Sequence, residues 1–324
     1  MRWKSCIIFL YGTNYKWPLF LALPLFVRNA WRWPVFLLYL GPMLLNPLTL
    51  HLPKNSLEAA RLYKELEDSK VLAGGTFLLN SMKLLKTKHT KTAHNIISLA
   101  KVDELKGVSF KDGTLTIKAM TRINDLMDAP LPDGHLKILH AVCQNISTTP
   151  IRNMATVGGN LTCRYTWTEM GAVMIALEAK MHFLGADGQE EIIDMEDFFK
   201  NAARSEKLFT HVTLRATPGA RAVYRRVKKT AHMDTPLLAL CIKTEIKDNK
   251  WHNTRVGINN AVAFAQRDTA LEEFLNKSIS SPDLGQKALE HITATIYDNR
   301  AGDYKKHIFR ISLRSAIEEL CHGS

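Results

Sequence analysis

Two pairs of adjacent glycines constrain this sequence more than any other feature. The first pair lies in residues 71–78 (VLAGGTFL), where an apolar strand pattern meets the start of a helical pattern. The second lies in residues 155–161 (ATVGGNL). Paired glycines reach positive φ at low cost and let backbone N–H groups converge without side chains in the way. Converging N–H groups beside a helix N-terminus bind anions, so two such loops suit a ligand with two phosphates.

The two glycine strings differ in how much they indicate. AGGT alone fits an ordinary strand–turn–helix connection equally well, and it matches neither the GxGxxG fingerprint nor the GxxxxGK[ST] phosphate loop. The second string is longer, because residues 150–153 (PIRN) precede it with one residue between them. A connection with a purely structural role does not need this detail, so the second string favours a binding function.

Composition limits the classes of protein that this chain can represent. With 324 residues, 46% of them hydrophobic, the chain can bury a large core, most naturally in two domains. The net charge of +12 attracts anions, but the basic residues are dispersed and form no recognisable nucleic-acid module. We therefore expect no nucleic-acid partner.

The five cysteines form no CxxC pair. Zinc or iron–sulfur ligation by this chain alone is therefore not expected. An odd, scattered set of cysteines also argues against a disulfide framework and favours buried thiols in a reducing cytoplasm.

Residues 1–48 differ in composition from the rest of the chain. They hold four of the six tryptophans, five of the twelve prolines, and five basic residues without an acidic one. The apolar runs 17–27 and 33–45 are interrupted, and each is shorter than the ~20 residues that a membrane-spanning helix needs. Three interpretations stay open: a start codon assigned too far upstream, an interfacial membrane anchor, or an additional packing element.

From residue 49 onward, strand patterns alternate with helical patterns. Asp112-Gly113 and Asp187-Gly188 predict hairpin turns, and Asn55 or Ser56 is a typical N-cap for a helix over 57–66. Residues 148–160 are predicted as a loop around the second glycine pair. Beyond residue 220 we predict strands at 237–247 and 251–262, and helices at 270–276, 284–297 and 304–322.

These elements predict an α+β fold with a boundary near residue 220. The first domain would span 49–220. A smaller domain, an antiparallel sheet with helices packed on it, would span 221–324.

Together, the two glycine strings resemble the FAD-binding medium subunit of the molybdenum hydroxylases, the family of xanthine dehydrogenase and carbon monoxide dehydrogenase. The family motif AGGT, followed by apolar residues and a lysine, is similar to 73–83, and the motif IRN-x-x-T-[IV]-GGN is similar to 151–160. The resemblance covers roughly residues 49–324 and is greatest to the shorter flavin subunits of bacterial xanthine dehydrogenase-like enzymes. It implies a two-part PCMH-type FAD-binding domain followed by the flavoprotein C-terminal domain.

The resemblance also implies, by position, which residues bind FAD. The first loop would hold the pyrophosphate through backbone N–H groups, and the second loop would hold its other side and the adjacent part of the cofactor. Ile146 falls where the family has an apolar residue near the flavin ring, and Glu169 where it usually has a cofactor-binding aspartate. The full implied set also includes two positions near the isoalloxazine: Ala73, Gly74, Gly75, Thr76, Phe77, Leu78, Ile146, Thr156, Val157, Gly158, Gly159, Asn160, Glu169, Leu208 and Arg226.

By the same resemblance, this chain is one subunit of a larger cytoplasmic oxidoreductase. A molybdenum cofactor on a large partner subunit would hydroxylate the substrate. 2Fe–2S clusters on a small partner subunit would deliver electrons to FAD on this chain, and FAD would pass them to NAD or another acceptor. Because the cofactor carries this chemistry, few protein acids or bases are required.

We therefore expect no catalytic residue and no metal ligand on this chain. Glu190, Glu191 and Asp194 are interpreted as solvated charges near a hairpin end. His89 and His94 are interpreted as surface or hydrogen-bonded side chains.

The segment between the second glycine pair and Glu169 departs from the family pattern. Where the family has small residues and a proline, this chain has Arg164, Tyr165 and Trp167, which are expected to narrow the path to the flavin or displace the second loop. These residues motivate one alternative, a scaffold subunit that kept the fold and lost FAD. The atypical N-terminal stretch motivates another, a membrane-attached protein whose function lies in 1–48. The basic run 221–229 is either a solvated face or a contact with FAD phosphate, a partner subunit or an anionic nucleotide.

Overall fold

The computed structural model describes residues 45, 47–88, 93–165, 168–201, 206–230, 235–262, 264–293 and 302–322. Almost all of the atypical N-terminal stretch, His89, Trp167 and the end of the helix expected over 284–297 lie outside the described residues. Among the helices that are described, none has the length and apolar composition needed to cross a bilayer.

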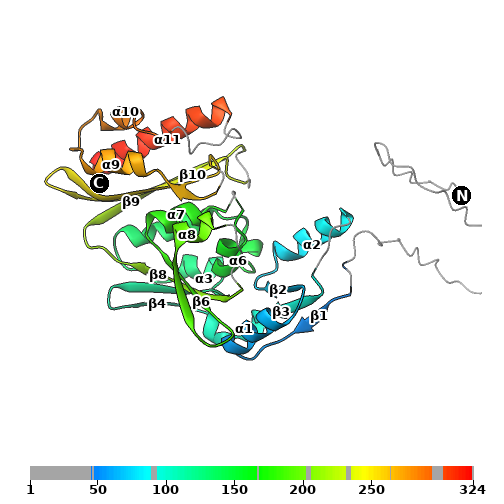
Figure 1. Cartoon of the computed structure of the whole chain (residues 1–324). Coiled ribbons are helices and arrows are strands. Elements are labelled where there is room, and N and C mark those ends of the chain that lie inside the picture. The colour runs from blue at the N-terminus through cyan, green and yellow to red at the C-terminus, as the bar shows by residue number, and fades with distance from the viewer. Residues whose placement is uncertain are drawn as a thin grey trace, which may run out of the picture. The chain divides into compact units, whose positions relative to one another are not determined.

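A small parallel sheet with strand order β1-β3-β2 opens the described chain (Figure 1). Its strands and their connecting helices are β1 (Thr49–His51), α1 (Ser56–Glu65), β2 (Ser69–Leu72), α2 (Leu78–Thr87) and β3 (Asn95–Ser98). Asn55 is the N-cap of α1, because its Oδ1 accepts the N–H of Glu58 at 2.8 Å. The first glycine pair lies between β2 and α2, at the carboxyl end of a parallel strand, where such sheets commonly bind ligands.

The second sheet is antiparallel and has the order β4-β5-β8-β6-β7. Its strands are β4 (Val108–Lys111), β5 (Thr114–Lys118), β6 (Lys180–Leu184), β7 (Glu190–Asp194) and β8 (Leu208–Arg215). The predicted turn at Asp112-Gly113 is confirmed, since both residues have positive φ, as a two-residue hairpin loop of the β4–β5 type requires. The predicted β6–β7 hairpin is also present, with a longer connection over 185–189.

Helices cover one face of this second sheet and enclose the largest apolar core. They include α3 (Ile123–Asp128), α4 (Ile138–Asn145), α7 (Met170–Ala176) and α8 (Met195–Lys200). Short 3₁₀ turns at Leu99–Lys101, Asp103–Leu105 and His135–Lys137 complete the connections. A separate apolar cluster joins α1 and β3 to Leu208 of β8, so the parallel sheet packs against the second sheet.

The structure corrects the prediction of a loop over 148–160. This stretch forms two short helices, α5 (Thr149–Arg152) and α6 (Val157–Thr162). Pro150 stands in the first turn of α5, where its fixed φ suits a helix start. Thr156 caps α6, because its Oγ1 accepts the N–H of Gly159 at 3.1 Å. The second glycine pair is therefore the first turn of a helix, and its glycines allow close packing there.

The C-terminal sheet has four antiparallel strands in the order β12-β11-β10-β9, where the sequence indicated two. The strands are β9 (Ala220–Val227), β10 (Leu238–Lys247), β11 (Lys250–Asn259) and β12 (Gln266–Arg267). β9 coincides with most of the basic run, whose arginines obscured the apolar alternation. Helices α9 (Thr269–Asn276), α10 (Leu284–Ala288) and α11 (Asp303–His322) cover one face of this sheet (Figure 1).

Helix α7 packs closely against the other face of the C-terminal sheet. A Cβ added to Gly257 of β11 would lie 2.0 Å from the carbonyl oxygen of Ala172, so only glycine allows this approach. Lys243 Nζ and Arg255 Nη2 both contact the carboxylate of Glu178, at 2.6 and 3.0 Å. The C-terminal sheet is thus held against α7, while the domain limits 1–48, 49–220 and 221–324 stay predictions.

Candidate cofactor-binding site

A cavity of about 900 Å³ lies where the parallel sheet, the second sheet and β9 come together. Both glycine strings line it, although they are separated by about eighty residues of sequence. Its volume lies in the upper part of the range found for small-molecule and cofactor sites. The cavity is therefore large enough for a ligand with two nucleotide-sized halves.

The first glycine loop offers unused hydrogen-bond donors to this cavity. Gly75 has φ +71°, and a Cβ on Gly74 would lie 2.0 Å from the carbonyl oxygen of Met154. The backbone conformation at 75 therefore favours glycine, and the close contact with the second motif requires glycine at 74. Within the described part of the chain, the N–H groups of Gly74, Gly75 and Thr76 donate no hydrogen bond. Together with the uncapped start of α2, they form a site for an anion.

The second glycine string contributes mainly through shape. The N–H groups of Val157 and Gly158 already donate to the carbonyls of Thr121 and Ala119, at 2.9 and 2.8 Å. A Cβ on Gly158 would lie 2.7 Å from the Ala119 oxygen, so this glycine is required by packing. Gly159 instead faces the first loop, since its added Cβ would lie 3.8 Å from Ala73 Cβ. The second motif therefore places a surface without a side chain opposite the first loop.

Two buried oxygens in the cavity wall lack a hydrogen-bond partner. Among the described residues, Asn160 Oδ1 and Glu169 Oε2 receive no hydrogen bond. Asn160 Oδ1 is an acceptor, and Glu169 Oε2 is an acceptor when its carboxyl is ionised; a buried acceptor without a partner is costly. They suit the hydroxyl groups of a ligand that carries ribose or ribityl chains.

Glu169 is also paired with Arg226 across the cavity wall. The Nε of Arg226 on β9 donates to Glu169 Oε1, and both side chains are almost fully buried. Burial raises the pKa of Glu169 to about 7, whereas the hydrogen bond and charge of Arg226 act in the opposite direction. This pair links the start of α7 to the C-terminal sheet within the lining of the cavity.

Arg164 and Tyr165, the bulky residues that depart from the family pattern, also line the cavity. Arg164 has φ +52°, donates to the carbonyls of Phe199 and Asn201, and lies 5.1 Å from the centre of the Phe198 ring. The Tyr165 ring contacts Phe77 of the first loop, with ring centroids 4.6 Å apart. Arg164 therefore extends toward α8, and Tyr165 bridges the two motifs at the cavity wall.

The structure brings together every residue of the implied FAD set except Val157. Val157 is fully buried in the core beneath α6, because the first residue of this helix faces inward. Sequence reasoning missed a wall made by Ala119, Met120 and Phe209, which belong to strands or to segments flanking strands. Strand alternation marks such residues as core and gives no sign that they line a cavity.

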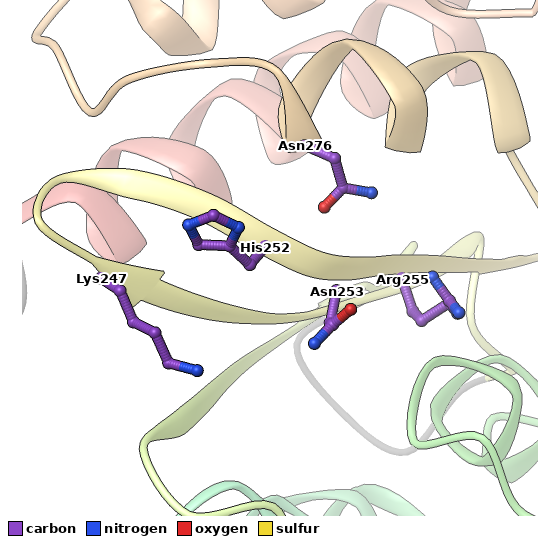
Figure 2. Close-up of a pocket in the computed structure, with 5 residues that line it drawn as sticks. All are labelled: Lys247, His252, Asn253, Arg255 and Asn276. Atoms are coloured by element: carbon purple, nitrogen blue, oxygen red, sulfur yellow. The ribbon is translucent and has the colours of Figure 1, made fainter.

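A second hollow, of about 450 Å³, lies beside the β10–β11 hairpin below α9 (Figure 2). Lys247, His252, Asn253, Arg255 and Asn276 line it, and none belongs to the implied set. The charges of its two basic side chains are already neutralised by acidic partners, since Lys247 pairs with Glu245 at 2.9 Å and Arg255 pairs with Glu178. We therefore assign the cofactor to the larger cavity.

The arrangement defines a class of protein: an α+β chain with a cofactor site that combines an anion-binding glycine loop, hydroxyl acceptors and apolar walls. FAD fits this donor and acceptor set, because its pyrophosphate needs N–H donors and its sugar chains need acceptors. Close backbone contacts further require glycine at positions 74 and 158, and the positive φ at 75 favours it.

Comparisons with known proteins identify the family. Residues 46–214 match the model of the FAD binding domain in molybdopterin dehydrogenase. The chain belongs to this family, and its cofactor is FAD.

Individual relatives agree with this family and fold. The carbon monoxide dehydrogenase medium chain of Hydrogenophaga pseudoflava is 33% identical over 143 residues, 44% of this chain, and the match spans about half (48%) of that protein. The glyceraldehyde dehydrogenase medium chain of Sulfolobus acidocaldarius is 21% identical over 81% of this chain and 94% of its own length. A solved carbon monoxide dehydrogenase from Hydrogenophaga pseudoflava has a similar fold, with a TM-score of 0.77 over 85% of this chain and 97% of that chain at 24% identity.

Proposed function

We propose that this chain is the electron-transfer subunit of a molybdenum-containing hydroxylase or dehydrogenase of the xanthine dehydrogenase-like type. The observation that carries the proposal is the single cavity in which both glycine motifs, Asn160 and Glu169 meet. FAD, when bound, supplies the redox chemistry that passes electrons from iron–sulfur clusters on a partner chain to NAD or another acceptor.

The residues of this chain bind and position the cofactor. The N–H groups at 74–76 hold the pyrophosphate, and Gly159 leaves room for it between the loops. Asn160 Oδ1 and, in its ionised form, Glu169 Oε2 accept hydrogen bonds from hydroxyl groups of the sugar chains. Apolar residues such as Ile146 and Leu208 exclude water from the ring system.

The proposal includes two partner subunits and a cytoplasmic location. The matched relatives are named as medium chains, which favours a complex with a molybdenum-bearing large subunit and a 2Fe–2S small subunit. The described cysteines 143, 163, 241 and 321 are free thiols, which favours a reducing compartment.

A flavin-retention experiment tests the binding part of the proposal. The full chain is incubated with FAD, desalted and examined by visible absorption. We expect about one flavin per chain, in line with one such cavity. Gly159→Val should lose it, since its side chain would enter the gap near Thr156 and Ala73. Gly302→Val is the matched control, because a Cβ there meets nothing within 4 Å. A folded wild-type protein that stays colourless would instead support the scaffold alternative.

A reoxidation experiment tests the electron acceptor. The flavin-loaded chain is reduced anaerobically by light with EDTA as the electron donor, and NAD⁺ is then added. Recovery of the oxidised flavin spectrum together with formation of NADH supports NAD as acceptor. Recovery with quinone or ferricyanide but not with NAD⁺ would remove NAD from the proposal and leave the FAD assignment intact.

A further inference from the structure

A cluster of two histidines and one glutamate lies on the second sheet, outside the FAD cavity. His211, His182 and Glu190 belong to the adjacent strands β8, β6 and β7, and their side-chain donor atoms all lie within 4.8 Å of one another. An irregularity in the β6–β8 pairing directly follows His182, whose register partner is His211. None of the three residues lines the FAD cavity.

Hydroxyl groups fix the outer nitrogen of each imidazole. The Thr210 hydroxyl donates to the His182 carbonyl at 3.1 Å, so its oxygen accepts the Nδ1–H of His211 at 3.0 Å. His182 Nε2 lies 3.0 Å from Thr213 Oγ1. Side chains that ligate metals through one imidazole nitrogen are typically held in this way through the other.

The two inner nitrogens then face one carboxylate oxygen. His182 Nδ1 lies 3.1 Å from Glu190 Oε1, and His211 Nε2 lies 4.0 Å from the same atom. Because His211 uses its proton toward Thr210, its Nε2 presents a lone pair to a negatively charged oxygen. Two acceptors that face each other call for a cation between them. The donor atoms of a tetrahedral zinc ion, each ~2.0–2.2 Å from the metal, lie ~3.3–3.6 Å apart, which falls between the 3.1 and 4.0 Å separations found here.

We propose that His182, Glu190 and His211 bind a divalent transition-metal ion of the zinc type. Two imidazoles and one carboxylate form a donor set that suits zinc, and the half-exposed Glu190 leaves one position open to water. The ligands come from three neighbouring strands, so a bound ion would crosslink β7, β6 and β8. Each strand contributes a single residue and the three residues form no sequential motif, so sequence analysis alone does not detect this site.

Coordination requires one local adjustment. The two rings are stacked, with centroids 4.0 Å apart and planes inclined by 16°, so their lone pairs run nearly parallel. The ring of His211 must tilt so that both lone pairs converge beside Glu190. The positive charge of Lys118, the register partner of His211 on β5, disfavours a cation at this site, and the negative charge of Glu190 offsets that repulsion.

Zinc titration of the full, untagged chain tests this proposal. The protein is treated with a chelator, desalted, and titrated with zinc chloride at neutral pH in a calorimeter. We expect one zinc ion to bind per chain, and we expect this binding to raise the unfolding temperature of the protein. His211→Ala and Glu190→Gln should remove this binding event, and Thr210→Val should weaken it by about tenfold or more. His252→Ala, which removes an exposed imidazole elsewhere, is the matched control and should leave zinc binding unchanged.

Two readouts keep the experiment decisive. Flavin retention should be the same in all of these variants, which separates this site from the proposed function. If a variant fails to fold, a zinc-edge anomalous difference map of the wild-type protein locates the ion. A peak beside His182 supports the proposal, whereas zinc bound only elsewhere, or no saturable binding, overturns it.

Discussion

Glu169 is the residue whose ionisation depends most directly on the fold around the cavity. Its carboxyl is 4% exposed, and the groups that act on it are Arg226 of β9 and Lys228 just beyond the end of β9, with the buried Tyr224 hydroxyl nearby. Burial raises the pKa from its ordinary value of 4.5 to about 7, so the folded protein holds a proton that the unfolded chain releases. The cavity wall therefore carries a proton-dependent contact.

This shift predicts how stability changes with pH. Because the folded pKa is raised, the contribution of Glu169 is fully present below pH 4.5 and is lost as pH rises through 7. Between these values, the unfolding free energy of the cofactor-free wild type should fall by roughly 3 kcal/mol relative to Glu169→Gln. Urea denaturation of both proteins across this range measures the difference. Two parallel pH profiles would show that Arg226 keeps the carboxylate ionised throughout.

At the scale of elements, the N-cap residue of α6, Thr156, contributes both to helix stability and to the shape of the FAD cavity. Thr156 is almost fully buried, and its Oγ1 is the acceptor for the Gly159 N–H at the first turn. Thr156→Ala should lower the unfolding free energy by about 1 kcal/mol, with a range of roughly 0.5–2 kcal/mol for lost N-caps. It should also weaken FAD binding, since Gly159 faces the cofactor loop.

Thr156→Ser is the matched variant, because it keeps the oxygen and loses only a methyl group. Urea denaturation and a fluorescence titration with FAD measure both effects. If serine proves as damaging as alanine, the methyl group rather than the cap holds α6 in place.

The elements were predictable to different degrees, for physical reasons. Hairpin turns such as Asp112-Gly113 and caps such as Asn55 depend on local conformation, so local sequence predicts them. Strand β9 was missed because Arg221, Arg225 and Arg226 interrupt the apolar alternation, and the acidic partners of Arg225 and Arg226 lie far away in sequence. The helical state of α6 was missed because glycine is a poor helix former, and the first turn of this helix depends on contacts with the distant residues Thr121 and Ala119.

At the scale of the whole molecule, the glycine motifs predicted the loops of the site but not its walls. Motif residues contact the cofactor through the backbone, and that requirement restricts the sequence locally. The wall residues Met120 and Phe209, and the His182 cluster, gain their position only through strand pairing. Pairing between distant strands is a property of the folded chain that a single sequence does not display.

The cavity also predicts that FAD couples the C-terminal sheet to the glycine loops. Its walls include the loop at 74–76, the start of α7 and Arg226 of β9, while Gly257 and Lys243 hold the neighbouring strands against α7. A ligand that binds only the folded state stabilises it by about 2.7 kcal/mol at a hundredfold excess over Kd. Because the cavity walls include residues of the glycine loops and of the C-terminal sheet, this stabilisation should reach β10 and β11 as well as the loops.

Hydrogen exchange with and without FAD measures this coupling. We expect slower amide exchange in the glycine loops and in β9–β11 of the wild type. Arg226→Ala should retain protection of the loops but lose much of it in β9–β11, because the contact between Glu169 and β9 is broken. Arg221→Ala, an exposed change on the same strand, should behave like the wild type. Protection confined to the loops in the wild type would mean that FAD binding does not stabilise the C-terminal sheet. If the Glu169–Arg226 contact couples the two regions, FAD must slow amide exchange on both sides of that contact.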